Sequence, residues 1–131
     1  MTTVTYETET PGGYPATLRV RELVFPTDLA PESGGTDTAP GPHDLFDASL
    51  ASCQGATAMW FAKRKGFPLE RVTVRVDSDD KDERAGVYRM TIHVELGGPL
   101  DDDQRGQIMR AIASCPIKKL MTTGDVQISY A

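Results

Sequence analysis

The sequence has few of the residues that hold small secreted proteins together, and it has no long apolar run. Two cysteines among 131 residues are too few for a disulfide framework. With two cysteines and two histidines, a structural zinc site is not expected either. No apolar stretch approaches the length of a membrane span, and the first residues lack the basic start and apolar core of a signal peptide. We therefore expect a cytoplasmic protein with no membrane partner.

Positive charge is also in the minority. The 14 Lys and Arg are outnumbered by 19 Asp and Glu, which gives a formal net charge of −5. Nonspecific nucleic-acid binding needs a positive surface, so nucleic acid is not expected as a partner. The composition, with 39% hydrophobic and 25% charged residues, is that of an ordinary globular protein, and the length fits one domain over residues 1–131.

The hydrophobic pattern predicts an α+β fold with antiparallel strands. Alternating apolar residues and turn signals predict strands, and the longer runs between Pro or Asp and Gly predict helices. Hairpins rather than helical crossovers join most of the strands. The expected elements are strands 4–9 and 16–25, a loop 26–41, a helix 42–65, a hairpin of strands 72–76 and 88–96, a helix 101–114 and a strand 126–130.

The helix predicted for residues 42–65 is the central element of this pattern. Pro42 suits the first helical position, and Gly66 suits the position after the last. Small residues fill its middle, so neighbours can approach it closely on several sides, as they do around a buried helix. One face is expected to carry Phe46, Leu50, Cys53, Thr57 and Trp60.

The two cysteines have settings that suit thiol chemistry. Cys53 lies on the predicted long helix, where it is either a small core residue or a thiolate that attacks peroxide. Cys115 lies at the end of the next helix, either as a packed residue or in an irregular, electropositive setting, in which Pro116 interrupts the helix and Lys118 and Lys119 supply positive charge. A pair of this kind can work together: one sulfur attacks, and the other resolves the product as a disulfide.

A thiolate at Cys53 needs a cation nearby, because this residue is roughly three turns into its helix and the helix dipole acts mainly on the first turn. The candidate cations are Arg19, Arg21, His43 and Lys118. The alternation of strand 16–25 places Arg19 and Arg21 on the same face.

Several segments together resemble the OsmC/Ohr family, the osmotically inducible and organic hydroperoxide resistance proteins. The resemblance rests on residues 34–37, 40–53, 63–70, 96–100 and 113–120, and it extends from about Asp28 to the C-terminus. It implies an OsmC/Ohr-like α+β fold in which two subunits intertwine as a homodimer, with antiparallel sheets around long central helices.

The resemblance also implies a mechanism. Cys53 matches the peroxidatic cysteine and Cys115 the resolving cysteine of a peroxidase that reduces organic hydroperoxides. A dithiol, with lipoylated proteins as the physiological source, is the implied reductant, and no bound metal or organic cofactor is implied. The family carries a Glu where this sequence has His43, with Asp44 beside it as a substitute, so the chain is similar to a divergent OsmC-like branch.

An alternative of a different class is a noncatalytic protein that keeps this fold and binds a small apolar ligand. The missing Glu favours this alternative, and the presence of both cysteines favours the peroxidase. A purely structural dimer is a third reading, although nothing in such a role requires two cysteines.

Overall fold

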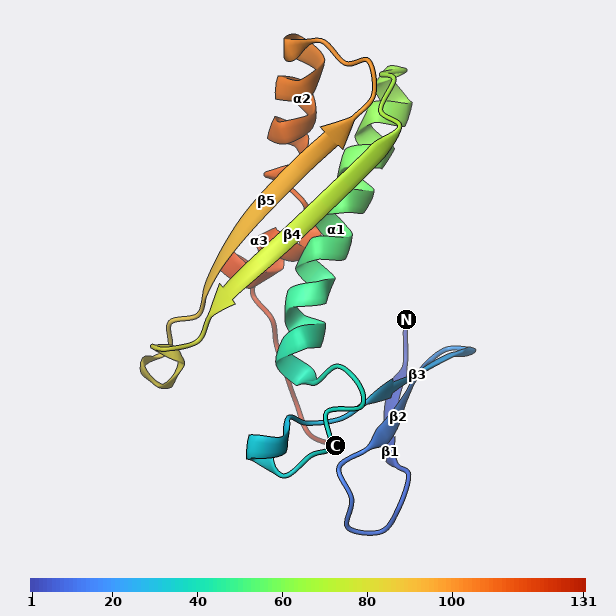
Figure 1. The fold of residues 1–131 in the computed structure, drawn as a ribbon, viewed down its shortest axis with the longest axis vertical. Coiled ribbons are helices and arrows are strands. Elements are labelled where there is room, and N and C mark those ends of the chain that lie inside the picture. The colour runs from blue at the N-terminus through green and yellow to red at the C-terminus, as the bar shows by residue number, and fades with distance from the viewer. The chain divides into compact units, whose positions relative to one another are not determined.

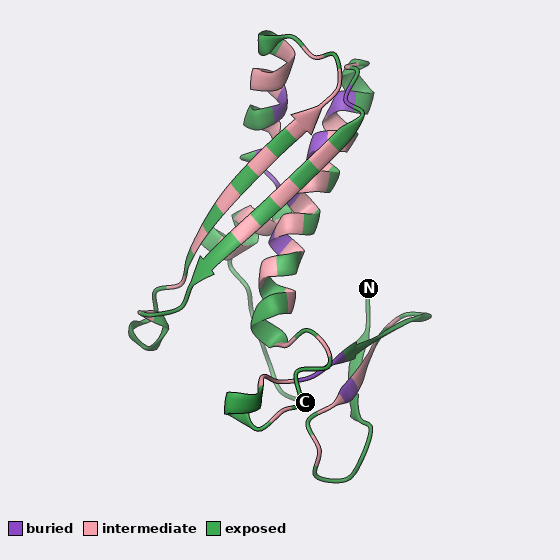
Figure 2. Ribbon diagram, viewed as in Figure 1, coloured by how far each residue is buried: buried purple, intermediate pink, exposed green.

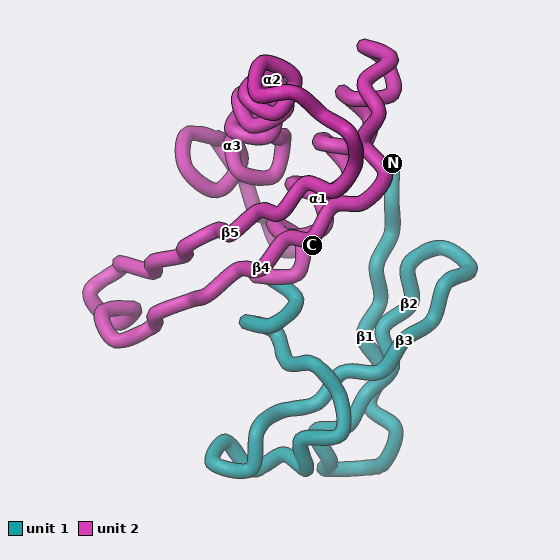
Figure 3. Tube along the Cα trace, turned by 45° about the horizontal axis from the view of Figure 1, so that its top comes forward, with its two compact units in different colours: residues 1–46 teal, residues 47–131 magenta.

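The computed structural model describes residues 1–131 and shows an α+β chain with two antiparallel sheets and three α-helices (Figure 1). The chain forms two compact units, residues 1–46 and residues 47–131 (Figure 3). The boundary falls near the start of helix α1 (Pro42–Lys65). The α+β class with antiparallel pairing, predicted from the sequence, is confirmed.

The first unit is built on a three-stranded sheet in the order β1 (Val4–Thr8), β2 (Ala16–Val20), β3 (Leu23–Thr27). The prediction of one strand over residues 16–25 is wrong, because the chain reverses at Arg21 and Glu22. Arg21 has φ of 55°, and Val20 pairs with Leu23 across this two-residue turn. Two-residue hairpin turns need positive φ and usually contain Gly or Asn. This turn contains neither Gly nor Asn, so the sequence does not mark it.

The loop after β3 is organised around one buried carboxylate. Asp28 is 2% exposed, and it accepts hydrogen bonds from the backbone N–H of Leu29, Thr36 and Thr38 and from both threonine hydroxyls. The hydrogen bond from the Thr36 hydroxyl is the largest cause of a pKa for Asp28 well below its ordinary value, and burial only partly opposes it. The loop therefore has a defined conformation, tied to an ionised Asp28.

The second unit packs its helices on one face of a β-hairpin (Figure 1). Its core is formed by buried Ala58, Ala62, Leu69, Ile108 and Ile112. Exposure alternates along both strands of the hairpin, because every second side chain points to the core (Figure 2). After α1 the elements are β4 (Arg71–Asp79), a 3-10 turn η2 (Glu83–Ala85), β5 (Arg89–Gly97), α2 (Asp102–Ile112) and α3 (Pro116–Thr122).

Local signals explain the helix ends. Gly66, with φ of 70°, follows the last residue of α1, and Asp101 and Gln104 form a reciprocal capping box at the start of α2. The helix predicted to reach Ser114 ends at Ile112, and Pro116 begins α3. None of these helices combines the length and the hydropathy needed to cross a membrane.

The strand predicted for residues 126–130 is absent. The alternating side chains of Val126, Ile128 and Tyr130 are 62%, 79% and 97% exposed, and no strand pairs with this segment. A strand needs a neighbour for its backbone hydrogen bonds, and within this chain the segment has none.

The buried face of α1 also differs from the predicted one. It is the row Leu50, Gln54, Ala58 and Ala62, spaced four residues apart. On the predicted face only Leu50 is buried, whereas Trp60 is 60% exposed. Within one chain, α1 is therefore buried along one row of residues, and the predicted close approach on several sides of a buried helix is not completed.

Candidate functional site

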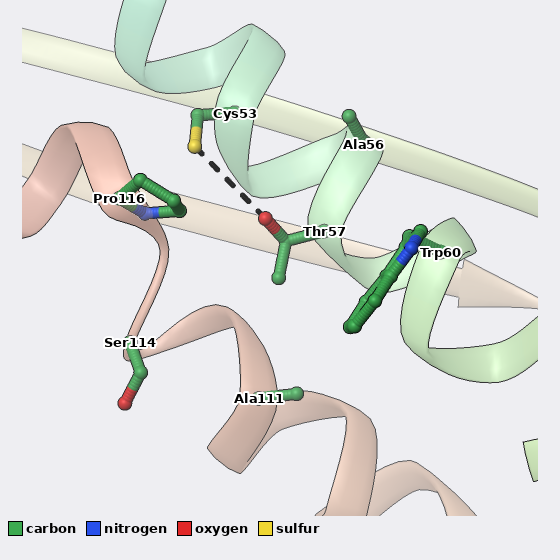
Figure 4. Close-up of a pocket in the computed structure, with 7 residues that line it drawn as sticks. All are labelled: Cys53, Ala56, Thr57, Trp60, Ala111, Ser114 and Pro116. Atoms are coloured by element: carbon green, nitrogen blue, oxygen red, sulfur yellow. Dashed lines mark hydrogen bonds between the residues drawn. The ribbon is translucent and has the colours of Figure 1, made fainter. Parts of the chain in front are cut away.

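A pocket of about 550 Å³ opens on the side of α1 that the core leaves uncovered (Figure 4). One wall is formed by α1, and the opposite wall by α2, the segment after it and the first residue of α3. No charged side chain is among the residues that line it, and most of its surface is apolar. The lining residues are Cys53, Ala56, Thr57, Trp60, Ala111, Ser114 and Pro116.

Cys53 is the nucleophilic group in this pocket. It is a free, half-buried cysteine, and its Sγ lies 3.9 Å from Oγ1 of Thr57, one turn further along α1. Trp60 forms the next part of the wall, and the Arg64 guanidinium lies 5.0 Å from the centre of its ring. The pocket can therefore present a reachable thiol to a molecule with an apolar body.

Cys115 is positioned differently. It is a free cysteine with 0% exposure, and it is the N-cap of α3, where its Sγ accepts from the Lys118 N–H at 3.4 Å. The amide Nε2 of Gln54 donates to the same sulfur at 3.0 Å and to the Ile112 carbonyl at 2.9 Å. Cys115 does not line the pocket, although the residues on either side of it do.

Four of the remaining predicted residues belong to the first unit, whereas Lys118 lies in α3 of the second unit, where its Nζ donates to the Ala113 carbonyl at 3.0 Å. Arg19 is an exposed residue of β2, whereas Arg21 lies in the β2–β3 turn, so the prediction that both lie on one strand face is wrong. His43 and Asp44 are exposed residues of the first turn of α1. The Asp44 carboxylate accepts from the Gly41 N–H at 2.9 Å, which is a helix-capping contact. The parts that these four residues play at Cys53 stay predictions.

Sequence reasoning missed Gln54. It is 2% exposed, and its amide connects α1 to both the end of α2 and Cys115. The only signal in the sequence was a long polar side chain among small residues in the middle of a helix. No group of three or more His, Cys, Asp or Glu side chains is placed to hold a metal ion.

The chain matches the family model described as "OsmC-like protein" over residues 35–131. No curated protein matches it. Among solved structures it is similar to a candidate osmotic-stress-induced and detoxification-response protein from Psychrobacter arcticus 273-4, with 22% identity, a TM-score of 0.77, and 95% of this chain and 90% of that chain covered.

Two further structures extend this likeness. An OsmC-like protein from Mycoplasma pneumoniae is 17% identical, with a TM-score of 0.74 over 94% of this chain and 89% of that chain. The organic hydroperoxide resistance protein OhrB of Bacillus subtilis is 23% identical, with a TM-score of 0.61 over 97% and 95%. At these identities the structures show a shared fold, and the family model covers most of the sequence. The chain belongs to the OsmC-like protein family.

Proposed function

We propose that the protein is a thiol peroxidase that reduces organic hydroperoxides through Cys53. The observation that carries this proposal is a free, partly exposed thiol on an apolar pocket of about 550 Å³. Apolar walls favour the organic part of an alkyl or aryl hydroperoxide over hydrogen peroxide, which has no apolar part to bury. Several proteins of the same fold are described as organic hydroperoxide resistance proteins, which supports this substrate class.

In the first step the Cys53 thiolate attacks the outer peroxide oxygen. The S–O bond forms as the O–O bond breaks, and the alkoxide leaves and takes up a proton as an alcohol. Sulfur is oxidised to the sulfenic acid, and the hydroperoxide is reduced by two electrons. We propose Arg19 as the cation that favours the thiolate, because the resembled family places its activating arginine early in the chain, and a guanidinium stays charged and can hydrogen-bond to a peroxide oxygen.

In the second step Cys115 resolves the sulfenic acid. Its sulfur forms a bond to the sulfur of Cys53, and the hydroxyl leaves with the Cys115 proton as water. A dithiol of the lipoyl type then reduces the disulfide by thiol exchange and becomes a disulfide itself. The pocket residues Ser114 and Pro116 flank Cys115, so the two cysteines belong to neighbouring parts of one region.

We also propose that the working form is a homodimer. Trp60 leaves a large apolar side chain 60% exposed on the face of α1 that the core does not cover. The unpaired segment 126–130 adds alternating apolar side chains with no partner in this chain. A second copy of the chain would cover apolar surface of this kind.

The test is a titration of the reduced protein with one equivalent of cumene hydroperoxide, followed by mass spectrometry. We expect the wild type to lose both thiols and to give two peptides joined by a disulfide between Cys53 and Cys115. In Cys53→Ser we expect no loss of the Cys115 thiol and no such disulfide. Hydrogen peroxide at the same concentration should react more slowly. If both thiols persist in the wild type, the peroxidase proposal is wrong.

The second candidate is noncatalytic binding of a small apolar ligand in the same pocket. The uncharged lining favours it, because a thiolate at Cys53 needs a cation nearby and no charged side chain lines the pocket. Retained thiols after the titration, together with saturable binding of an apolar fluorescent probe that Trp60→Ala weakens, would support this function.

A further inference from the structure

Cys53 and Gln54 are consecutive residues of α1, so their side chains leave the helix about 100° apart. Cys53 faces the pocket, and Gln54 faces the core. The Cys115 sulfur is bound on the Gln54 side of the helix by the Gln54 amide and the Lys118 N–H. The sulfur proposed to resolve Cys53 is therefore held by the residue next to Cys53, and outside the pocket.

We propose that Gln54 is a positioning residue that retains the Cys115 thiol in the core and sets the rate at which a disulfide with Cys53 forms. The Ile112 carbonyl can only accept hydrogen bonds, so it fixes which end of the Gln54 amide is the nitrogen. The two hydrogens of Nε2 are then directed to Ile112 and to Cys115. Gln54 thus holds the sulfur from a rigid, buried anchor.

Disulfide formation requires the two sulfurs to approach to about 2.05 Å. Cys115 must therefore leave Gln54 and also give up its capping contact at α3. This part of the inference rests on the proposed peroxidase, in which the Cys53 sulfenic acid persists until Cys115 leaves the Gln54 amide. During that time a second hydroperoxide can transfer an oxygen to it and give sulfinic acid and an alcohol. The strength of the Gln54–Cys115 contact then sets the division between disulfide and sulfinic acid.

The principal test uses Gln54→Met, which keeps an unbranched side chain of similar length and removes the donor. Diamide serves as the oxidant, because it takes two electrons and two protons from the dithiol without any hydroperoxide. We expect the disulfide to form about five-fold faster than in the wild type, as the loss of one hydrogen bond of ordinary strength would give. With excess cumene hydroperoxide, the ratio of disulfide to sulfinic acid should rise by a similar factor.

The matched control is Ile108→Val. Ile108 is fully buried in the same core and makes no hydrogen bond to either sulfur, so this change loosens the core and leaves the Gln54–Cys115 contact intact. The Gln54 role is overturned if Gln54→Met forms the disulfide no faster than Ile108→Val. Should Gln54→Met fail to fold, Gln54→Asn replaces it, since its shorter amide cannot reach both acceptors, and the same criterion applies.

A second measurement separates this inference from the peroxidase itself. In a Cys53→Ser background, Cys115 should react with a disulfide reagent about five-fold faster when Gln54→Met is added. Faster labelling and faster diamide oxidation support the Gln54 role even in a protein that does not consume hydroperoxide. Unchanged labelling in the Cys53→Ser background, together with normal consumption of hydroperoxide by the protein that retains Cys53, overturns the Gln54 role and leaves the peroxidase in place.

Discussion

Trp60 offers the sharpest test of the proposed homodimer. Its side chain is 60% exposed in the isolated chain. A whole tryptophan side chain presents about 250 Å², so roughly 150 Å² remains for a partner to cover, worth about 3–4 kcal/mol at about 25 cal/mol per Å². Ordering of side chains at the interface offsets part of this free energy, but a symmetric dimer buries Trp60 twice, once from each subunit. Trp60→Ala should therefore weaken the dimer by roughly 3 kcal/mol or more, about a hundredfold or more in Kd.

The assay is sedimentation or light scattering over a dilution series that covers the dissociation of both proteins. The wild type should give roughly twice the chain mass of 14.3 kDa at micromolar concentration, and Trp60→Ala should dissociate at much higher concentration. Val87→Ala, at a 41% exposed position near the hairpin end, is the control and should leave Kd unchanged. A Kd for Trp60→Ala within about threefold of the wild type would refute the placement of this face in the interface.

Three further outcomes are expected. In Cys115→Ser, one equivalent of hydroperoxide should give sulfenic acid at Cys53, and a second equivalent should give sulfinic acid, both detected by mass spectrometry. Normal turnover with a dithiol would contradict the resolving role. Arg19→Ala should slow alkylation of Cys53 at pH 7 by about tenfold while Arg21→Ala does not, and equal rates would exclude Arg19 as the activating cation. Hydrogen bonding lowers the pKa of Asp28 below its ordinary value of 3.8, so the stability it provides is present above about pH 4 and is lost as the pH falls further. In acid unfolding followed by circular dichroism, Asp28→Asn should lower stability at pH 7 and weaken its acid dependence, and an unchanged profile would contradict this linkage.

Patterns that depend on neighbours in the chain could be predicted from the sequence. Alternation predicted the hairpin, and the register of β4 and β5 confirms it. Pro42 and Gly66 marked both ends of α1 correctly. The two cysteines could be selected as candidates from their settings alone. Each of these features follows from backbone preferences or from a repeat over a few residues, so tertiary structure is not needed to see it.

Other features of the fold could not be predicted from the sequence, because they depend on which segments of the chain pair or pack with one another. The break at Arg21 has no turn residue to mark it, and it is set by the pairing of β2 with β3. Segment 126–130 has the alternation of a strand but no edge to pair with in this chain. The hydrogen bond between Gln54 and Cys115 joins residues 61 positions apart, so only the packing of α1 against α2 and the start of α3 places that amide against the sulfur. Periodicity determines which elements can form, whereas contacts between distant segments decide which face of α1 is buried and which cysteine remains reachable.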